Sequence, residues 1–149
     1  MKNLRTNVVK SLFALVCAGL LFGAFSTAMA GEKGHKMVIQ VSTNDEQTQK
    51  IALNNAVNLQ KLYGMDNVTI EIVAYGPGLG LLTTKSKEAD RVKSLAMQNI
   101  TFSACGNTMA KVEKKTGKKP ELVEGVGTVK AGVARIMALQ EEGYAYLRP

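Results

Sequence analysis

The chain has 149 residues and a net charge of +7, and this length is typical of one domain. Apolar residues make up 46% and charged residues 21%, so there is enough apolar material for a core and the composition excludes a largely disordered chain. Two cysteines and one histidine exclude a disulfide-rich scaffold, a four-cysteine zinc site and any two-histidine metal site.

The first thirty residues have the pattern of a secretory signal peptide. Three basic residues lie within the first ten, residues 11–25 are an uncharged apolar run, and Ala28-Met29-Ala30 is a small-x-small cleavage site. A membrane anchor is the alternative, but the apolar run is shorter than the ~20 residues that span a bilayer. We therefore expect a signal peptide at residues 1–30, export to the periplasm, a domain at residues 31–149 and no membrane contact after cleavage.

The rest of the chain predicts alternating strands and helices. Helical spacing of apolar side chains marks some segments, and short apolar runs between glycine or polar residues mark others as strands. In chain order we expect a strand at 37–42, a helix at 46–63, a strand at 68–75, a helix at 85–97, a strand at 100–105, a helix at 107–115, an edge strand at 121–126, a helix at 129–142 and a strand at 144–147. This alternation predicts an α/β domain with an open, mostly parallel sheet of about five strands and helices on both faces.

The sequence also predicts the surroundings of a few side chains near the two ends of the domain. His35 lies in a polar lead-in at residues 31–36, and we expect it to be a mobile terminal residue, not a ligand. The inner face of the last helix is expected to consist of Val129, Val133, Ile136 and Leu139.

Cys105 is the main candidate for chemistry. It is the only cysteine in residues 31–149, so it cannot form an internal disulfide, and it lies where a strand passes into a helix. Free amide groups and the dipole at a helix N-terminus favour a thiolate, and they would also stabilise a persulfide anion. A small buried hydrophobic residue is the alternative, because free cysteines are often buried. Next to it, Gly106 permits close approach of a ligand, and Asn107 and Thr108 can cap the helix or donate hydrogen bonds.

Gly76, Gly78 and Gly80 lie in the loop after the second strand. The loop is not a dinucleotide fingerprint, because Leu81 stands where the third glycine is required, and it lacks the Lys-Ser/Thr of a Walker loop. It is either a tight turn or a nest of backbone N–H groups that binds an anion or a sulfur species. Ligands of open α/β sheets bind beyond the carboxyl ends of strands, so this loop and Cys105 are candidates to line one cleft.

The basic residues do not predict a nucleic-acid partner. A run without interleaved aromatic residues, best explained as a solvated helix face, consists of Lys111, Lys114, Lys115, Lys118 and Lys119. Asp45 and Glu46, the acidic pair nearest a strand end, are explained as a helix cap. We expect no metal and no cofactor.

Three segments resemble exported members of the DsrE/DsrF-like family. They are Gly76 to Leu79, Phe102 to Met109, and Ala131 to Tyr146, and the resemblance covers residues 36–149. It implies a three-layer, flavodoxin-like fold and a homo-oligomer, a trimer or hexamer. In the sulfur-relay members a cysteine at a strand-to-helix junction carries a persulfide, which implies that role for Cys105.

Two functions are consistent with these observations. The first is a sulfur carrier or sulfurtransferase that uses a Cys105 persulfide and has a sulfur donor or acceptor protein as partner. The second is a non-catalytic module whose glycine loop and oligomer interfaces bind a small ligand. Candidate interface residues are Leu79, Leu81, Leu82, Tyr144 and Tyr146.

Overall fold

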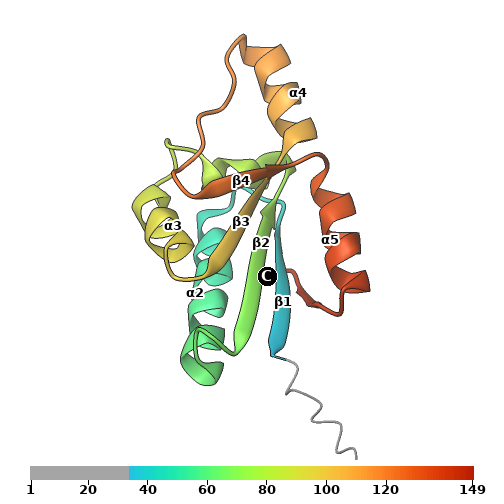
Figure 1. Ribbon diagram of the computed structural model, residues 1–149. Coiled ribbons are helices and arrows are strands. Elements are labelled where there is room, and N and C mark those ends of the chain that lie inside the picture. Colours follow the sequence, from blue (N-terminus) through green and yellow to red (C-terminus); the bar gives the residue numbers. More distant parts are fainter. Residues whose placement is uncertain (1–33) are drawn as a thin grey trace, which may run out of the picture. The chain divides into compact units, whose positions relative to one another are not determined.

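A five-stranded parallel sheet forms the middle of the structure (Figure 1). The computed structural model describes residues 34–149, and the signal peptide expected at residues 1–30 lies outside them. The elements are β1 (His35–Val41), α2 (Glu46–Tyr63), β2 (Val68–Ala74), the 3-10 helix η1 (Gly76–Leu82), α3 (Ala89–Ala96), β3 (Ile100–Cys105), α4 (Gly106–Thr116), β4 (Val126–Val129), α5 (Gly132–Glu141) and β5 (Ala145–Leu147).

The strands lie in the order β4-β3-β2-β1-β5, and every neighbouring pair is parallel. At the centre of the sheet, Ile39 of β1 pairs with Ile72 of β2, and Ile72 pairs with Phe102 of β3. Parallel strands bring their carboxyl ends to one edge, so the loops after β1, β2 and β3 lie at the same edge. The predicted open parallel sheet is confirmed.

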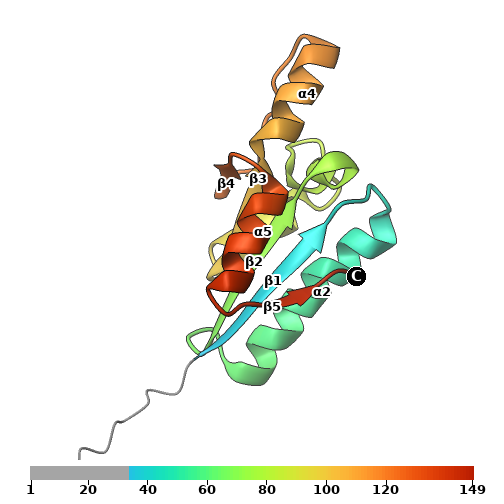
Figure 2. The same ribbon diagram turned by 90° about the vertical axis from the view of Figure 1, so that its right-hand side faces the viewer.

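Helices cover the two faces of the sheet unequally (Figures 1 and 2). α2 and α3 pack on one face over a large core that includes the fully buried Ile70, Ile72 and Phe102. α5 covers the other face, and the smaller core there consists of Val38, Val73, Ile136 and Leu139. α4 follows β3 and extends beyond the sheet (Figure 2). The layers match the predicted flavodoxin-like arrangement. No helix within residues 34–149 is long and apolar enough to cross a membrane.

The edge strand and α3 start four or more residues later than predicted. The edge strand forms as β4 and not at residues 121–126, because Gly125 turns the chain with a φ of 86° and only the residues after it pair with β3. Leu122 makes a single antiparallel bridge with Thr83 instead. α3 starts at residue 89 and not at residue 85, because residues 87–88 still form a turn.

The inner face of α5 also differs from the prediction. Its buried residues are Gly132, Ile136 and Leu139, a spacing that forms one stripe along a helix. Val133 lies beside this stripe and is 67% exposed, so its assignment to the inner face was wrong. Val129 belongs to β4, because its pairing with Cys105 extends the sheet.

His35 is ordered, contrary to the prediction of a mobile terminal residue. It is the first residue of β1, its backbone N–H donates to Asn67 O at 2.9 Å, and it pairs in register with Val68. Its ring lies on that of Tyr63, with the ring centroids 3.7 Å apart. The strand therefore continues into the polar lead-in, because backbone pairing does not require apolar side chains.

The leucines of η1 belong to the core and not to an exposed interface. Leu79, Leu81 and Leu82 are at most 3% exposed and pack within the larger core. Their place as interface residues was wrong, because the 3-10 helix turns all three side chains towards the sheet layer. Tyr146 of β5 is 43% exposed and stays a candidate for such an interface.

Candidate functional site

Cys105 lies at the junction of a strand and a helix, as predicted. It is the last residue of β3 and the N-cap of α4, and its side chain is buried, with 5% of the residue exposed. Its Sγ accepts a hydrogen bond from the Gly132 N–H at 3.2 Å. A Cβ at Gly132 would lie 3.3 Å from the Cys105 Cβ, so glycine lets the start of α5 approach the thiol.

The electrostatics around the thiol favour its ionised form. Burial on its own raises the pKa of Cys105, but hydrogen bonds outweigh burial and the pKa is lowered overall. The groups that lower the pKa are the Thr108 hydroxyl and the backbone N–H groups of Gly132, Thr108 and Asn107, and of these the Gly132 N–H makes a hydrogen bond to Sγ. Two of these residues begin α4 and the third begins α5, so the N-termini of two helices meet at one sulfur. The arrangement can hold a thiolate or another sulfur anion.

Thr108 joins the thiol to the glycine loop. The Gly76 N–H donates to Thr108 Oγ1 at 3.0 Å, and the Thr108 hydroxyl is one of the groups that lower the pKa of Cys105. Gly76 has a φ of 53°, in the left-handed region that glycine adopts without strain. The structure therefore connects the first glycine of the loop to Cys105 through one side chain.

The other two glycines of the loop have different surroundings. A Cβ at Gly78 would lie 2.2 Å from Val41 O, so this glycine lets η1 pack directly on the end of β1. The Gly78 N–H donates to Tyr75 O at 3.1 Å, within the chain itself. Nothing lies within 4 Å of a Cβ at Gly80. Their role in anion binding stays a prediction.

Gly106 and Asn107 lie under the connection between β4 and α5. A Cβ at Gly106 would lie 3.1 Å from Val129 O, and the Asn107 N–H donates to Lys130 O at 3.2 Å. Together with the Gly132 N–H on Cys105 Sγ, these contacts fasten residues 129–132 across the N-terminus of α4. The start of α5 therefore lies directly against the thiol.

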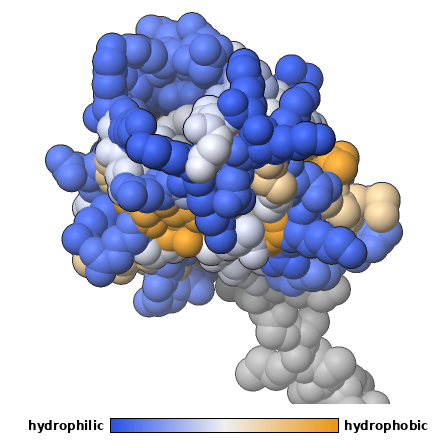
Figure 3. All heavy atoms as spheres, turned by 90° about the horizontal axis from the view of Figure 1, so that it is seen from above, coloured by the Kyte–Doolittle hydropathy of each residue, from blue (hydrophilic) through white to orange (hydrophobic). Residues whose placement is uncertain are grey.

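A groove of about 760 Å³ lies between η1 and α4. It includes Gly76 and Gly80, and its apolar part includes Leu79 and Val112. Three lysines, Lys85, Lys118 and Lys119, line it and take part in no ion pair within residues 34–149. In Figure 3, which views the molecule from the α4 end, hydrophilic residues cover most of the surface. Two lysines predicted on a solvated helix thus follow α4 and line a groove with a positive rim.

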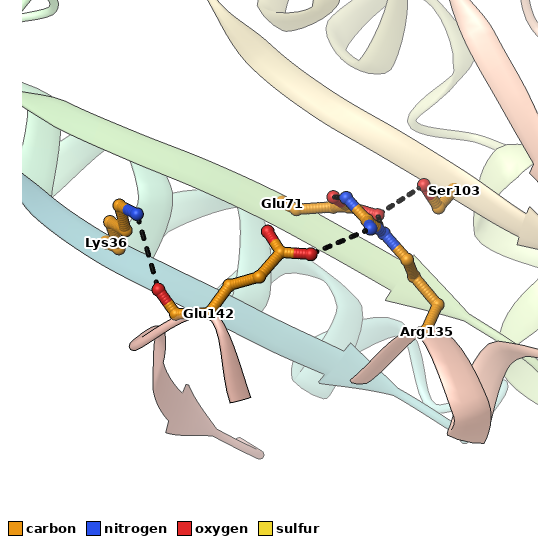
Figure 4. Close-up of polar contacts among 5 residues, drawn as sticks. All are labelled: Lys36, Glu71, Ser103, Arg135 and Glu142. Atoms are coloured by element: carbon orange, nitrogen blue, oxygen red, sulfur yellow. Dashed lines mark hydrogen bonds and ion pairs between the residues drawn. The ribbon is translucent and has the colours of Figure 1, made fainter. Parts of the chain in front are cut away.

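Sequence analysis missed a buried ion pair on the α5 face of the sheet (Figure 4). Glu71 of β2 has a side chain that is 4% exposed, and Arg135 of α5 donates to both of its carboxylate oxygens, from Nε at 3.0 Å and from Nη2 at 2.7 Å. The Ser103 hydroxyl donates to the same carboxylate at 2.6 Å. The sequence does contain one sign of this ion pair: Glu71 is a charged residue within the mostly apolar strand β2.

This ion pair has further charged and aromatic neighbours. Hydrogen bonding to Glu71 raises the pKa of the Arg135 guanidinium, which therefore stays charged. Glu142 lies 3.7 Å from Arg135 Nη1. Burial, followed by the nearby carboxylates of Glu71 and Glu142, raises the pKa of Tyr144. Residues 34–149 contain no cluster of three side chains that could hold a metal ion.

Comparison with known proteins agrees with this geometry. The sequence model of the DsrE/DsrF-like family matches residues 35–149. A solved structure of similar fold is a protein of unknown function, MTH1491 from Methanobacterium thermoautotrophicum, with a TM-score of 0.70 and 33% sequence identity. The match covers 77% of this chain and 99% of that one. No protein of curated function matches the chain.

The thiol geometry makes a first prediction. Native Cys105 is expected to react with iodoacetamide with a midpoint pH below that of the same chain unfolded in urea, because only the folded chain places the Gly132 N–H and the start of α4 beside the thiolate. The measurement is the alkylation rate against pH in both states. Thr108→Val, which keeps the thiol and removes the hydroxyl donor, should move the native midpoint upwards. A native midpoint at or above that of the unfolded chain would make Cys105 a core residue.

Proposed function

The chain belongs to the DsrE/DsrF-like family, and from this premise we propose that it is a sulfur carrier or sulfurtransferase that holds a persulfide on Cys105 Sγ. The observation that carries the proposal is the hydrogen bond from the Gly132 N–H to Cys105 Sγ at the N-terminus of α4, where the pKa of the thiol is lowered. Donation to Sγ stabilises the Cys105 thiolate, which is the form that attacks a sulfur donor and the form that is released when an acceptor takes the outer sulfur.

The proposed reaction has two steps without net oxidation. In the first, the Cys105 thiolate attacks the sulfane sulfur of a donor, a new S–S bond forms, and the donor's own bond to that sulfur breaks, so that the rest of the donor leaves with the electron pair. In the second, an acceptor thiolate attacks the terminal sulfur, and Cys105 leaves as a thiolate. The donors around Sγ favour both the attacking thiolate and the departing one.

Sulfur uptake tests this proposal. After incubation of residues 31–149 with thiosulfate or polysulfide, the intact mass is expected to rise by one sulfur atom, about 32 Da, and to fall back after treatment with a reducing thiol. Cys105→Ser should show no gain, since the variant lacks the only thiol of this segment. A wild-type mass that does not change with either donor, while circular dichroism shows a folded chain, would contradict the proposal.

The groove supports the second candidate, a module that binds a small ligand without sulfur transfer. Its apolar part and its three lysines, which form no ion pair with any residue in 34–149, would suit an organic anion. The same mass measurement separates the two functions, because ligand binding in the groove needs no thiol and survives in Cys105→Ser.

Export and self-association are part of the proposal. The leader pattern of residues 1–30 supports export to the periplasm, where a sulfur donor or acceptor protein would be the partner. Three exposed apolar residues of α5 and β5, Val133, Met137 and Tyr146, support a homo-oligomer, a trimer or hexamer, that packs through this face.

A further inference from the structure

α5 brings the N–H group of Gly132 to the thiol, yet little apolar surface holds this helix in place. Its first residue, Gly132, donates to Cys105 Sγ. Beyond that glycine only Ile136 and Leu139 of the helix are buried, and the core beneath it contains just two sheet residues, Val38 and Val73. Apolar contacts are also non-directional, so this small core does not by itself fix the orientation of α5 on the sheet.

The ion pair supplies a directional contact close to the thiol. Arg135 lies three residues after Gly132, which is about one helical turn. It donates to both carboxylate oxygens of Glu71, and this bidentate geometry fixes the orientation of the guanidinium as well as its distance from the carboxylate. Ser103, which donates to the same carboxylate, is two residues before Cys105, so both side chains lie on the α5 face of β3.

We propose that Glu71 and Arg135 are positioning residues for Cys105, and that their ion pair holds the first turn of α5 so that the Gly132 N–H stays on the sulfur. The inference rests on the proposed function only in taking Cys105 as the reactive group. Neither residue touches the sulfur; they act through the backbone of α5. The alternative is an ion pair that stabilises the fold and leaves the thiol unaffected.

The test is the pH profile of Cys105 alkylation in four variants. In Arg135→Met, the rate at pH 7 is expected to fall about threefold to tenfold, which corresponds to about half to one pH unit in the midpoint. Arg135→Lys keeps the positive charge but cannot form both hydrogen bonds to the carboxylate. Its alkylation rate at pH 7 should lie between those of Arg135→Met and the wild type. Arg91→Met is the matched control, because Arg91 pairs with Glu88 and its side chain is 33% exposed, against 34% for Arg135. It should leave the profile unchanged.

The fourth variant separates positioning from stability. Glu71→Gln combined with Arg135→Met removes both charges, so no buried charge is left unpaired and the folded state should recover stability. The thiol should stay as weakly reactive as in Arg135→Met, because the double variant also lacks the ion pair that holds the first turn of α5 on the sheet. If alkylation recovers together with stability, or if it changes equally in Arg91→Met, the assignment is wrong.

Two further results keep the outcome unambiguous. If Arg135→Met does not fold, the comparison rests on Arg135→Lys and the double variant, and unchanged profiles in both would overturn the proposal. The readout is thiol ionisation and not sulfur transfer. A wild type that takes up no sulfur but whose profile shifts in Arg135→Met would therefore contradict the proposed function and leave the positioning role standing.

Discussion

Gly78→Ala is expected to destabilise the domain by about 3 kcal/mol or more, the upper end of the cost of overpacking. The added Cβ would lie 2.2 Å from Val41 O, 2.6 Å from Val41 C and 2.9 Å from Ser42 N. All three are backbone atoms of the end of β1 and the loop after it, so no side-chain rotation relieves the contact. Either η1 or the sheet edge has to move, and η1 carries three leucines of the main core.

Urea denaturation followed by circular dichroism measures this effect. Gly80→Ala is the matched control, because it lies in the same 3-10 helix and a Cβ there would meet nothing within 4 Å. It should leave stability within about 1 kcal/mol of the wild type and can raise it by restricting the unfolded chain. Equal unfolding midpoints for the two alanine variants would show that η1 does not pack on β1 as described.

The sequence correctly predicted a helix when the residues that start and stop it lie next to it in the chain. The helix predicted at residues 46–63 forms with these bounds, because its start and its stop are both local: Thr48 N–H donates to Asp45 Oδ1 at 2.7 Å, and Gly64 ends it. Both the strand-to-helix junction at Cys105 and the fold class follow from the order of such elements. Asp45 is thus a helix cap, as the sequence indicated.

Contacts between distant residues could not be predicted in this way. β4 forms where β3 offers a partner, and apolar spacing alone placed the strand several residues too early. The sequence did not reveal the ion pair of Glu71, because its partner Arg135 lies 64 residues further on. The hydrogen bond from the Gly132 N–H to Cys105 Sγ joins a backbone group to a side chain 27 residues earlier, and no pattern of side chains in the sequence predicts it.

These missed contacts change what the candidate site is. From the sequence, one helix N-terminus was expected to act on the thiol, whereas in the structure the hydrogen bond to the sulfur comes from Gly132, the first residue of α5. The thiol is therefore sensitive to how α5 is attached to the sheet. This attachment is mostly polar, because the apolar core on that face is small.

Arg135→Met is expected to lower the free energy of unfolding by about 3 kcal/mol, the lower end of the range for breaking a buried ion pair. The reason is the Glu71 carboxylate, which is 4% exposed and keeps only the Ser103 hydroxyl as a side-chain partner within residues 34–149. The loss lies at the lower end because Arg135 keeps 34% of its side chain in water, and water already screens part of the pair.

The double variant Glu71→Gln/Arg135→Met should be more stable than Arg135→Met alone, because a neutral amide is far less costly to bury than an unpaired carboxylate. Urea unfolding at pH 7 measures all three chains. Arg91→Met, which breaks a more distant pair with Glu88 at 3.7 Å, should cost less than about 1 kcal/mol. If Arg135→Met unfolds at the same urea concentration as Arg91→Met, the Glu71–Arg135 ion pair contributes no more to stability than an exposed ion pair does. In that case α5 would be held by Ile136 and Leu139, and the Gly132 N–H would stay on Cys105 Sγ without help from Glu71.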